Sequence, residues 1–201
     1  MGRVSYSQYS MWSACPQQYK LKYVDKIGVY ESNIHLVFGT SMHETIQDFL
    51  EIMYGESKKQ AMSIDLDEQL LANLTSNFIK EKEKMDGKLP CTKEELEEFY
   101  GDGRKILHTL TTKIKKFYPK SGYELVGIEI KLEADIKTGV SFIGYIDVTL
   151  KDKISDKIII IDLKTSTPSS VFKKAANAEY GFSSKGTFIN FLPLEAQENV
   201  L

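Results

Sequence analysis

The fold of this chain follows from two neighbouring stretches, Gly144-Tyr145-Ile146-Asp147-Val148-Thr149-Leu150 and Ile161-Asp162-Leu163-Lys164. Side chains alternate between the faces of a strand, so Asp162 and Lys164 point the same way while Leu163 points into the core. Two carboxylates, from Asp147 and Asp162, and one ammonium at a sheet edge suit a divalent cation and a phosphodiester. A plain strand with a surface lysine could carry the same Asp-x-Lys tripeptide, but the second carboxylate on the preceding strand favours a site.

Length and composition indicate one domain. The chain has 201 residues, a formal net charge of −2 and 42% hydrophobic residues, which is enough apolar content for a core. Cys15 and Cys91 are far apart and form no metal-type spacing. No signal peptide is visible at the start, and the longest apolar run, Ile158 to Ile161, is too short to span a bilayer. We therefore expect a cytoplasmic protein that does not enter the membrane.

Apolar residues at helical spacing predict helices ahead of the strands. We expect them within residues 5–23, 41–54, 64–86 and 92–118. Ser5 and Ser7 are candidate N-caps and Pro16 can start a second helical turn. Thr92 and Glu95 match a capping box.

His43 lies beside the apolar stripe of residues 41–54. A histidine in such a position is more often packed than bound to a metal, so its position alone favours a packing role. Gly39 precedes this expected helix and would let the backbone approach another group closely.

The entry segment is unusually aromatic. Its rings are Tyr6, Tyr9, Trp12, Tyr19 and Tyr23. We expect most of them to pack in the core.

After Gly122 the apolar residues recur at every second position, which predicts strands at 123–135, 140–151 and 157–164. Short turns between them indicate an antiparallel meander. Glu129, on the first strand, could point to the same site as Asp147. A loop follows at 165–170, and residues 171–180 could form a short basic helix.

These elements, in this order, resemble the PD-(D/E)xK nuclease superfamily. The chain looks most like its RecB-type branch, which includes the nuclease domains of bacterial helicase–nucleases, phage exonucleases and the CRISPR adaptation nucleases. The resemblance covers residues 5–168. It rests on five motifs: Ser5-Tyr6-Ser7 with Cys15-Pro16-Gln17-Gln18-Tyr19, Phe38-Gly39-Thr40-Ser41-Met42-His43, Glu129, Gly144-Tyr145-Ile146-Asp147, and Ile161-Asp162-Leu163-Lys164.

The resemblance implies roles for particular residues. His43, Asp147, Asp162 and the backbone carbonyl of Leu163 would bind Mg²⁺ or Mn²⁺, and the histidine ligand favours Mn²⁺. Lys164 would position the attacking water, and Glu129 would be a supporting carboxylate. The candidates for contacts with DNA are Tyr145, Ser166, Lys173 and Lys174.

Two features depart from the branch. Its usual Gln-x-x-x-Tyr helix after the Asp-x-Lys strand has no counterpart after Thr167. The chain therefore ends early, diverges there, or needs a second copy or a partner subunit to complete the DNA groove. Cys15 matches the first ligand of the iron–sulfur cluster found in some members, but the other three cysteines are absent. We therefore expect no such cluster in this chain alone and a buried, apolar role for Cys15.

The expected fold is α/β, restriction-endonuclease-like, with a small mixed sheet and an antiparallel catalytic hairpin flanked by helices. Residues 1–201 would form one domain: a helical part at 5–119, a catalytic sheet at 122–168 and a divergent or truncated segment at 169–201. The expected function is metal-dependent hydrolysis of DNA, as an exonuclease in recombination, repair or phage replication, in a bacterium or a phage-infected cell. Alternatives are a sequence- or structure-specific endonuclease, including a mobile-intron type, and a non-catalytic DNA-binding or scaffold module.

Overall fold

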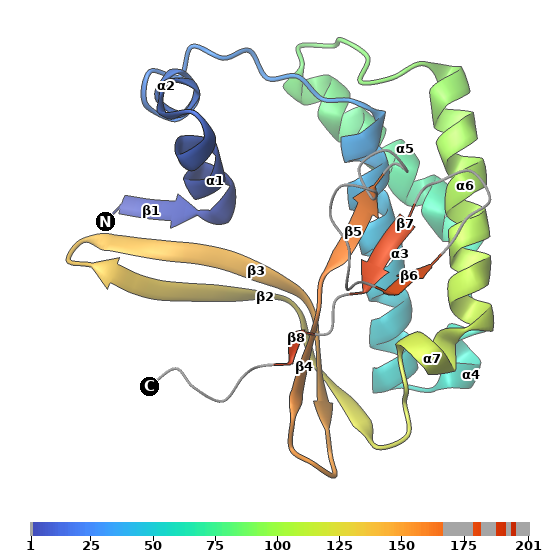
Figure 1. Cartoon of the computed structure of the whole chain (residues 1–201). Helices are drawn as coiled ribbons and strands as arrows, with labels where there is room; N and C mark the ends of the chain where they lie inside the picture. Colours follow the sequence, from blue (N-terminus) through green and yellow to red (C-terminus); the bar gives the residue numbers. More distant parts are fainter. Residues whose placement is uncertain (1, 167–178, 182–187, 192–193, 196–201) are drawn as a thin grey trace. The chain divides into compact units, whose positions relative to one another are not determined.

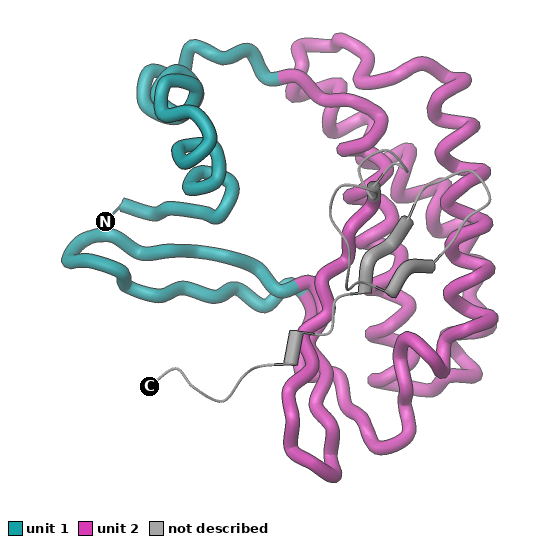
Figure 2. The backbone as a smooth tube through the Cα atoms, viewed as in Figure 1, with its two compact units in different colours: residues 1–30, 129–146 teal, residues 31–128, 147–201 magenta. Residues whose placement is uncertain are grey.

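The computed structural model describes residues 2–166, 179–181, 188–191 and 194–195. These residues form two compact units, each made of segments that are separate in the sequence (Figure 2). Unit 1 comprises residues 1–30 and 129–146, and unit 2 comprises residues 31–128 and 147–201. Two long strands, β2 (Tyr123–Lys137) and β3 (Val140–Asp152), each pass from one unit to the other.

Unit 1 begins with a short strand and a helical segment. The strand β1 (Gly2–Ser5) pairs in parallel with β3, with Ser5 opposite Ile143. It is followed by α1 (Tyr6–Ala14), α2 (Pro16–Tyr19) and the π-helical turn η1 (Lys20–Val24). Ser5 caps α1 through a capping box with Gln8, and α2 begins at Pro16, as expected from the sequence.

Two expectations for unit 1 are wrong. Tyr6, Tyr9 and Trp12 are exposed rather than packed in the core, because α1 buries none of its residues. Cys15 is also exposed. Its Sγ accepts a weak hydrogen bond from the backbone N–H of Gln18 at 3.5 Å, so it caps α2 instead of filling a core position.

Unit 2 contains the hydrophobic core, which three long helices build. They are α3 (Ile34–Gly55), α5 (Leu66–Lys84) and α6 (Lys93–Thr112), which pack against one another (Figure 1). The short helices α4 (Lys58–Ala61) and α7 (Ile114–Phe117) complete the helical part. Thr92 and Glu95 form the expected capping box at the start of α6. Within the described part of the chain, every helix falls short of what a membrane span requires.

Helix α3 begins earlier than the sequence predicts. Asn33 caps it by accepting a hydrogen bond from Leu36 N–H, and Val37 and Phe38 extend its apolar face. Gly39 therefore lies inside the helix, not before it. A Cβ at Gly39 would lie 3.0 Å from Thr165 Oγ1, so glycine permits the close approach that was expected there.

Two further short strands pair within unit 2. The strand β4 (Ile158–Ile161) pairs antiparallel with β3, and β8 (Leu194–Glu195) pairs antiparallel with β4. The order β1-β3-β4-β8, with β2 also on β3, is a mixed sheet beside helices, as expected. Apolar residues of β3, β4 and β5 join the helical core: Val148, Leu150, Ile161 and Leu163.

The expected strand 157–164 is interrupted at Asp162. Residues Leu163–Ser166 form a separate strand, β5, which pairs with β7 (Phe188–Phe191), and β7 pairs with β6 (Glu179–Gly181). The expected basic helix at 171–180 lies outside the described residues except for Glu179 and Tyr180, which belong to β6. Lys173 and Lys174 also lie outside the described residues.

Candidate metal and catalytic site

The end of the β3–β4 ladder brings together the two predicted carboxylates. Val148 pairs with Ile161 in the last step of this antiparallel register. The ladder ends there, and the next residues of the two segments are Asp147 in β3 and Asp162 between β4 and β5. The break in the strand therefore lies at one of the residues proposed from the sequence.

Asp147 is held in place from two elements. Its Oδ2 accepts a 2.6 Å hydrogen bond from the backbone N–H of Leu163 in β5. Its backbone carbonyl lies 3.5 Å from Gln47 Nε2, which donates to it from α3. Because both the backbone and the carboxylate are held, the orientation of the Asp147 side chain is constrained.

His43 faces the same carboxylate from α3. Its Nδ1 lies 4.0 Å from Asp147 Oδ2, and its side chain is only about a quarter exposed. His43 and Gln47 are one helical turn apart and therefore lie on one face of α3. Sequence reasoning missed Gln47, although its i, i+4 spacing from His43 was the available signal.

Lys164 and Asp162 form the exposed side of the arrangement. Lys164 Nζ lies 2.6 Å from Asp162 Oδ1, while Leu163 between them is buried. This is the alternation expected from the sequence: the two polar side chains share a face and the leucine points into the core.

The electrostatics of Asp147 reflect these neighbours. Burial raises the pKa of its carboxyl above the ordinary value, and the negative charge of Asp162 adds to the rise. The hydrogen bond from Leu163 and the charges of His43 and Lys164 act in the opposite direction. Asp147 is therefore a buried carboxylate that lacks a directly bonded cation among the described residues.

Glu129 lies where β2 crosses from unit 2 to unit 1. It has a positive φ of 49°, which is uncommon for a side-chain-bearing residue. The partly buried positions of β2 are 123, 125 and 127 and then 128 and 130. The regular alternation of faces is therefore broken just before Glu129. The ligand atoms of Glu129, His43 and Asp147 all lie within 4.8 Å of one another.

This donor set fits a divalent cation. Ligand atoms on one ion about 2.1 Å away are separated by roughly 3 to 4 Å, which is the spacing of His43 Nδ1 and Asp147 Oδ2. An imidazole nitrogen with carboxylate oxygens suits Mn²⁺ as well as Mg²⁺. Asp147 retains acceptor capacity beyond the bond from Leu163.

A model of the PD-(D/E)XK nuclease superfamily matches residues 3–182 of this chain. The chain belongs to this superfamily. The match covers the whole described site, including both strands of the ladder and the Asp-x-Lys residues. A comparison with curated proteins finds no match.

Not every site residue proposed from the superfamily resemblance falls in one group. His43, Glu129 and Asp147 come together as possible ligands, whereas Asp162 is outside that group and is paired with Lys164. Tyr145 is exposed on β3 in unit 1, and Ser166 is the last residue of β5.

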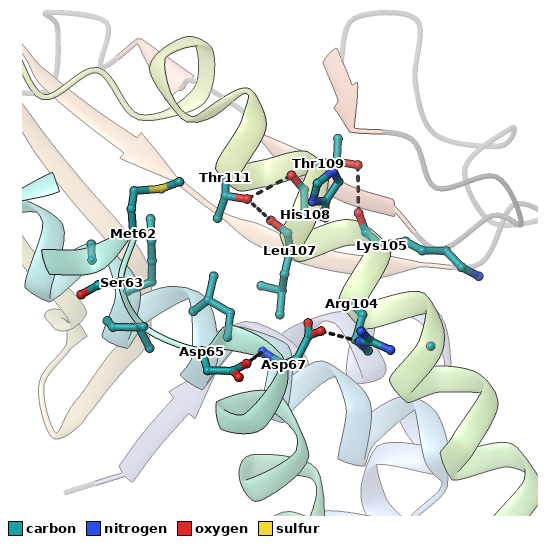
Figure 3. A pocket seen from close by; sticks show the side chains of 15 residues that line it. Met62, Ser63, Asp65, Asp67, Arg104, Lys105, Leu107, His108, Thr109 and Thr111 are labelled. Carbon is teal, nitrogen blue, oxygen red and sulfur yellow. Dashed lines mark hydrogen bonds and ion pairs between the residues drawn. The ribbon is translucent and has the colours of Figure 1, made fainter. Parts of the chain in front are cut away.

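An open groove elsewhere in unit 2 is separate from the superfamily's site residues. It has a volume of about 920 Å³ and lies between α6 and the segment joining α4 to α5 (Figure 3). Arg104 Nε lies 2.5 Å from Asp67 Oδ2 at its edge, and this pair raises the pKa of Arg104. None of the predicted site residues lines this groove, so we place the candidate chemistry at the β3–β4 ladder.

Proposed function

We propose that this chain is a metal-dependent deoxyribonuclease that hydrolyses phosphodiester bonds. The observation that carries the proposal is the arrangement at the end of the β3–β4 ladder. There His43 faces the buried Asp147, and the Asp162–Lys164 pair follows the end of β4. The superfamily membership supplies the nuclease class.

Each residue of the site has its own role in the proposed reaction. His43, Asp147 and Asp162 would hold Mg²⁺ or Mn²⁺, with the Leu163 carbonyl, and Glu129 would support them. When bound, such an ion polarises a phosphoryl oxygen and lowers the pKa of a bound water. Leu163 N–H donates to Asp147 Oδ2 and so constrains the orientation of this carboxylate, which supports the proposed role.

Lys164 would orient the attacking water and offset the negative charge that develops on the phosphorus-bound oxygens. Its exposed ammonium is held by Asp162 in the structure. If the Asp162 carboxylate bound a cation instead of Lys164, the Lys164 ammonium would be free to contact the phosphate or the water.

The proposal extends to an exonuclease of recombination, repair or phage replication. Its support is the similarity of the His43, Asp147 and Asp162-x-Lys164 motifs to the RecB-type branch. The absence of a Gln-x-x-x-Tyr pattern from the sequence after Thr167 supports a partner subunit or second copy that would complete the DNA groove.

Incubation with linear and covalently closed circular DNA, each single- and double-stranded, tests the proposal with Mg²⁺ and with Mn²⁺. Metal-dependent loss of linear DNA, abolished by Asp162→Ala, is expected. Nicking of closed circles would assign an endonuclease instead. Absence of cleavage with either metal, by a folded protein that still binds DNA, would assign a non-catalytic binding module.

A further inference from the structure

Helix α1 carries three exposed aromatic side chains in one row. Tyr6, Tyr9 and Trp12 are 69%, 52% and 53% exposed, and we call them the aromatic ridge. Their spacing is i, i+3 and i+6, so successive rings are neighbours on the helix surface. Exposure of one large ring is ordinary, but a contiguous row on a helix that buries no residue indicates an interaction surface.

The chemistry of the ridge is specific. Tyrosine and tryptophan combine a flat apolar ring with a polar group, and they suit contacts that stay partly hydrated. Apart from these rings, α1 carries only small or polar residues and Met11. A partner helix that buried an aliphatic face would find few complementary side chains here.

Charge around the ridge favours an anionic occupant. Residues 1–30 contain four basic residues, Arg3, Lys20, Lys22 and Lys26, and one acidic residue, Asp25, although acidic residues outnumber basic ones in the whole chain. Arg3 pairs with Glu133 and Lys20 pairs with Asp25, so the excess of positive charge rests on Lys22 and Lys26. Lys22 Nζ lies 5.8 Å from the centre of the Tyr23 ring. A segment that combines exposed rings with an excess of cations matches the features that bind single-stranded nucleic acid.

The spacing of the rings also suits stacked bases. Residues three apart on an α-helix have Cβ atoms about 5–6 Å apart, and an unpaired strand is not held to the roughly 3.4 Å step of the duplex. Successive nucleotides can therefore reach successive rings. Unit 1 offers a further exposed ring, Tyr145 on β3, two residues beyond the Ser5–Ile143 pair that leads into α1.

We propose that the aromatic ridge of α1 is a stacking platform for the bases of single-stranded DNA. This inference rests on the proposed nuclease function and specifies the form of DNA that the protein holds. Paired bases in a duplex cover their faces, so the ridge would discriminate in favour of unpaired strands.

Trp12 is the single tryptophan of the chain, so tryptophan fluorescence reports directly on the ridge. We expect oligo(dT) to quench the intrinsic fluorescence of Trp12 in the full-length Asp162→Ala protein with chelator present, where cleavage does not occur. An abasic oligonucleotide of equal length keeps the phosphates and loses the bases, so it should quench far less.

Alanine variants measure the contribution of the rings. Tyr9→Ala and Trp12→Ala should each weaken binding of a labelled oligo(dT), followed by anisotropy, by between about fivefold and about a hundredfold. Alanine favours helix, so α1 should remain folded. Ser10→Ala on the same helix and Ile154→Ala, an exposed apolar residue in unit 2, are matched controls and should leave affinity unchanged.

Three results would overturn the platform: equal quenching by the abasic strand, equal quenching by a duplex, or quenching by anionic lipid vesicles but not by oligo(dT). The inference and the nuclease proposal fail separately. Cleavage by the wild-type protein without quenching refutes only the platform, and quenching without any cleavage refutes only the nuclease proposal.

Discussion

Leu163 N–H and Asp147 Oδ2 are joined by a 2.6 Å hydrogen bond between β5 and β3. Both residues are buried. The bond therefore ties the Asp-x-Lys segment to the carboxylate of the neighbouring strand, and it makes Asp147 a structural as well as a candidate catalytic residue.

We expect Asp147→Ala to abolish nuclease activity and to lower the free energy of unfolding by about 1–3 kcal/mol, because the buried Leu163 N–H loses its acceptor. Asp147→Asn keeps an acceptor at this position and should abolish activity with a smaller loss of stability. Urea unfolding of the two variants measures the difference. Equal stability of Asp147→Ala and the wild type would mean that the bond contributes nothing to the fold.

Asp162→Ala and Lys164→Ala should each remove activity and leave the protein folded. Their ion pair is partly exposed, and such pairs contribute about 0–1 kcal/mol. Thermal unfolding in the absence of metal, together with a cleavage assay, checks both parts. A loss above about 3 kcal/mol in either variant would assign a structural role.

His43→Ala should weaken Mn²⁺ binding more than it lowers stability, because the imidazole faces Asp147 at the edge of the core. Calorimetric titration with Mn²⁺ gives the affinity. His108→Ala, in α6 beside the separate groove, is the matched control and should bind Mn²⁺ as the wild type does. Unchanged affinity in His43→Ala would return this histidine to a packing role.

Two glycines of α6 provide a test of the core that does not involve activity. A Cβ at Gly103 would lie 2.6 Å from Leu70 Cδ2 and 3.1 Å from Phe38 Cε2, whereas a Cβ at Gly101 meets no atom within 4 Å. Gly103→Ala should therefore destabilise the protein by about 1–3 kcal/mol through overpacking, partly offset by helix propensity. Gly101→Ala should raise the free energy of unfolding by up to about 1 kcal/mol, because alanine has the higher helix propensity. Chemical unfolding of both variants is the measurement, and a stabilised Gly103→Ala would contradict the tight packing of α6 on α3 and α5.

The sequence by itself determined the order of the elements and the local chemistry. Capping residues such as Ser5 and Thr92 specify helix starts because they bond to backbone groups three residues away. The alternation around Leu163 likewise predicts that Asp162 and Lys164 share a face, because neighbouring side chains of a strand alternate. Such signals depend only on residues close in the chain.

Only the tertiary structure decided which distant groups meet. The ladder of β3 with β4 ends beside Asp147 and Asp162. The packing of α3 brings His43 to the carboxylate of Asp147 and Gln47 to its backbone carbonyl. The positive φ at Glu129 and the exposure of Tyr6, Tyr9 and Trp12 had no local signal. An aromatic residue has the same periodicity whether a neighbouring element covers it or leaves it in water, so its burial is settled by the packing of the whole chain.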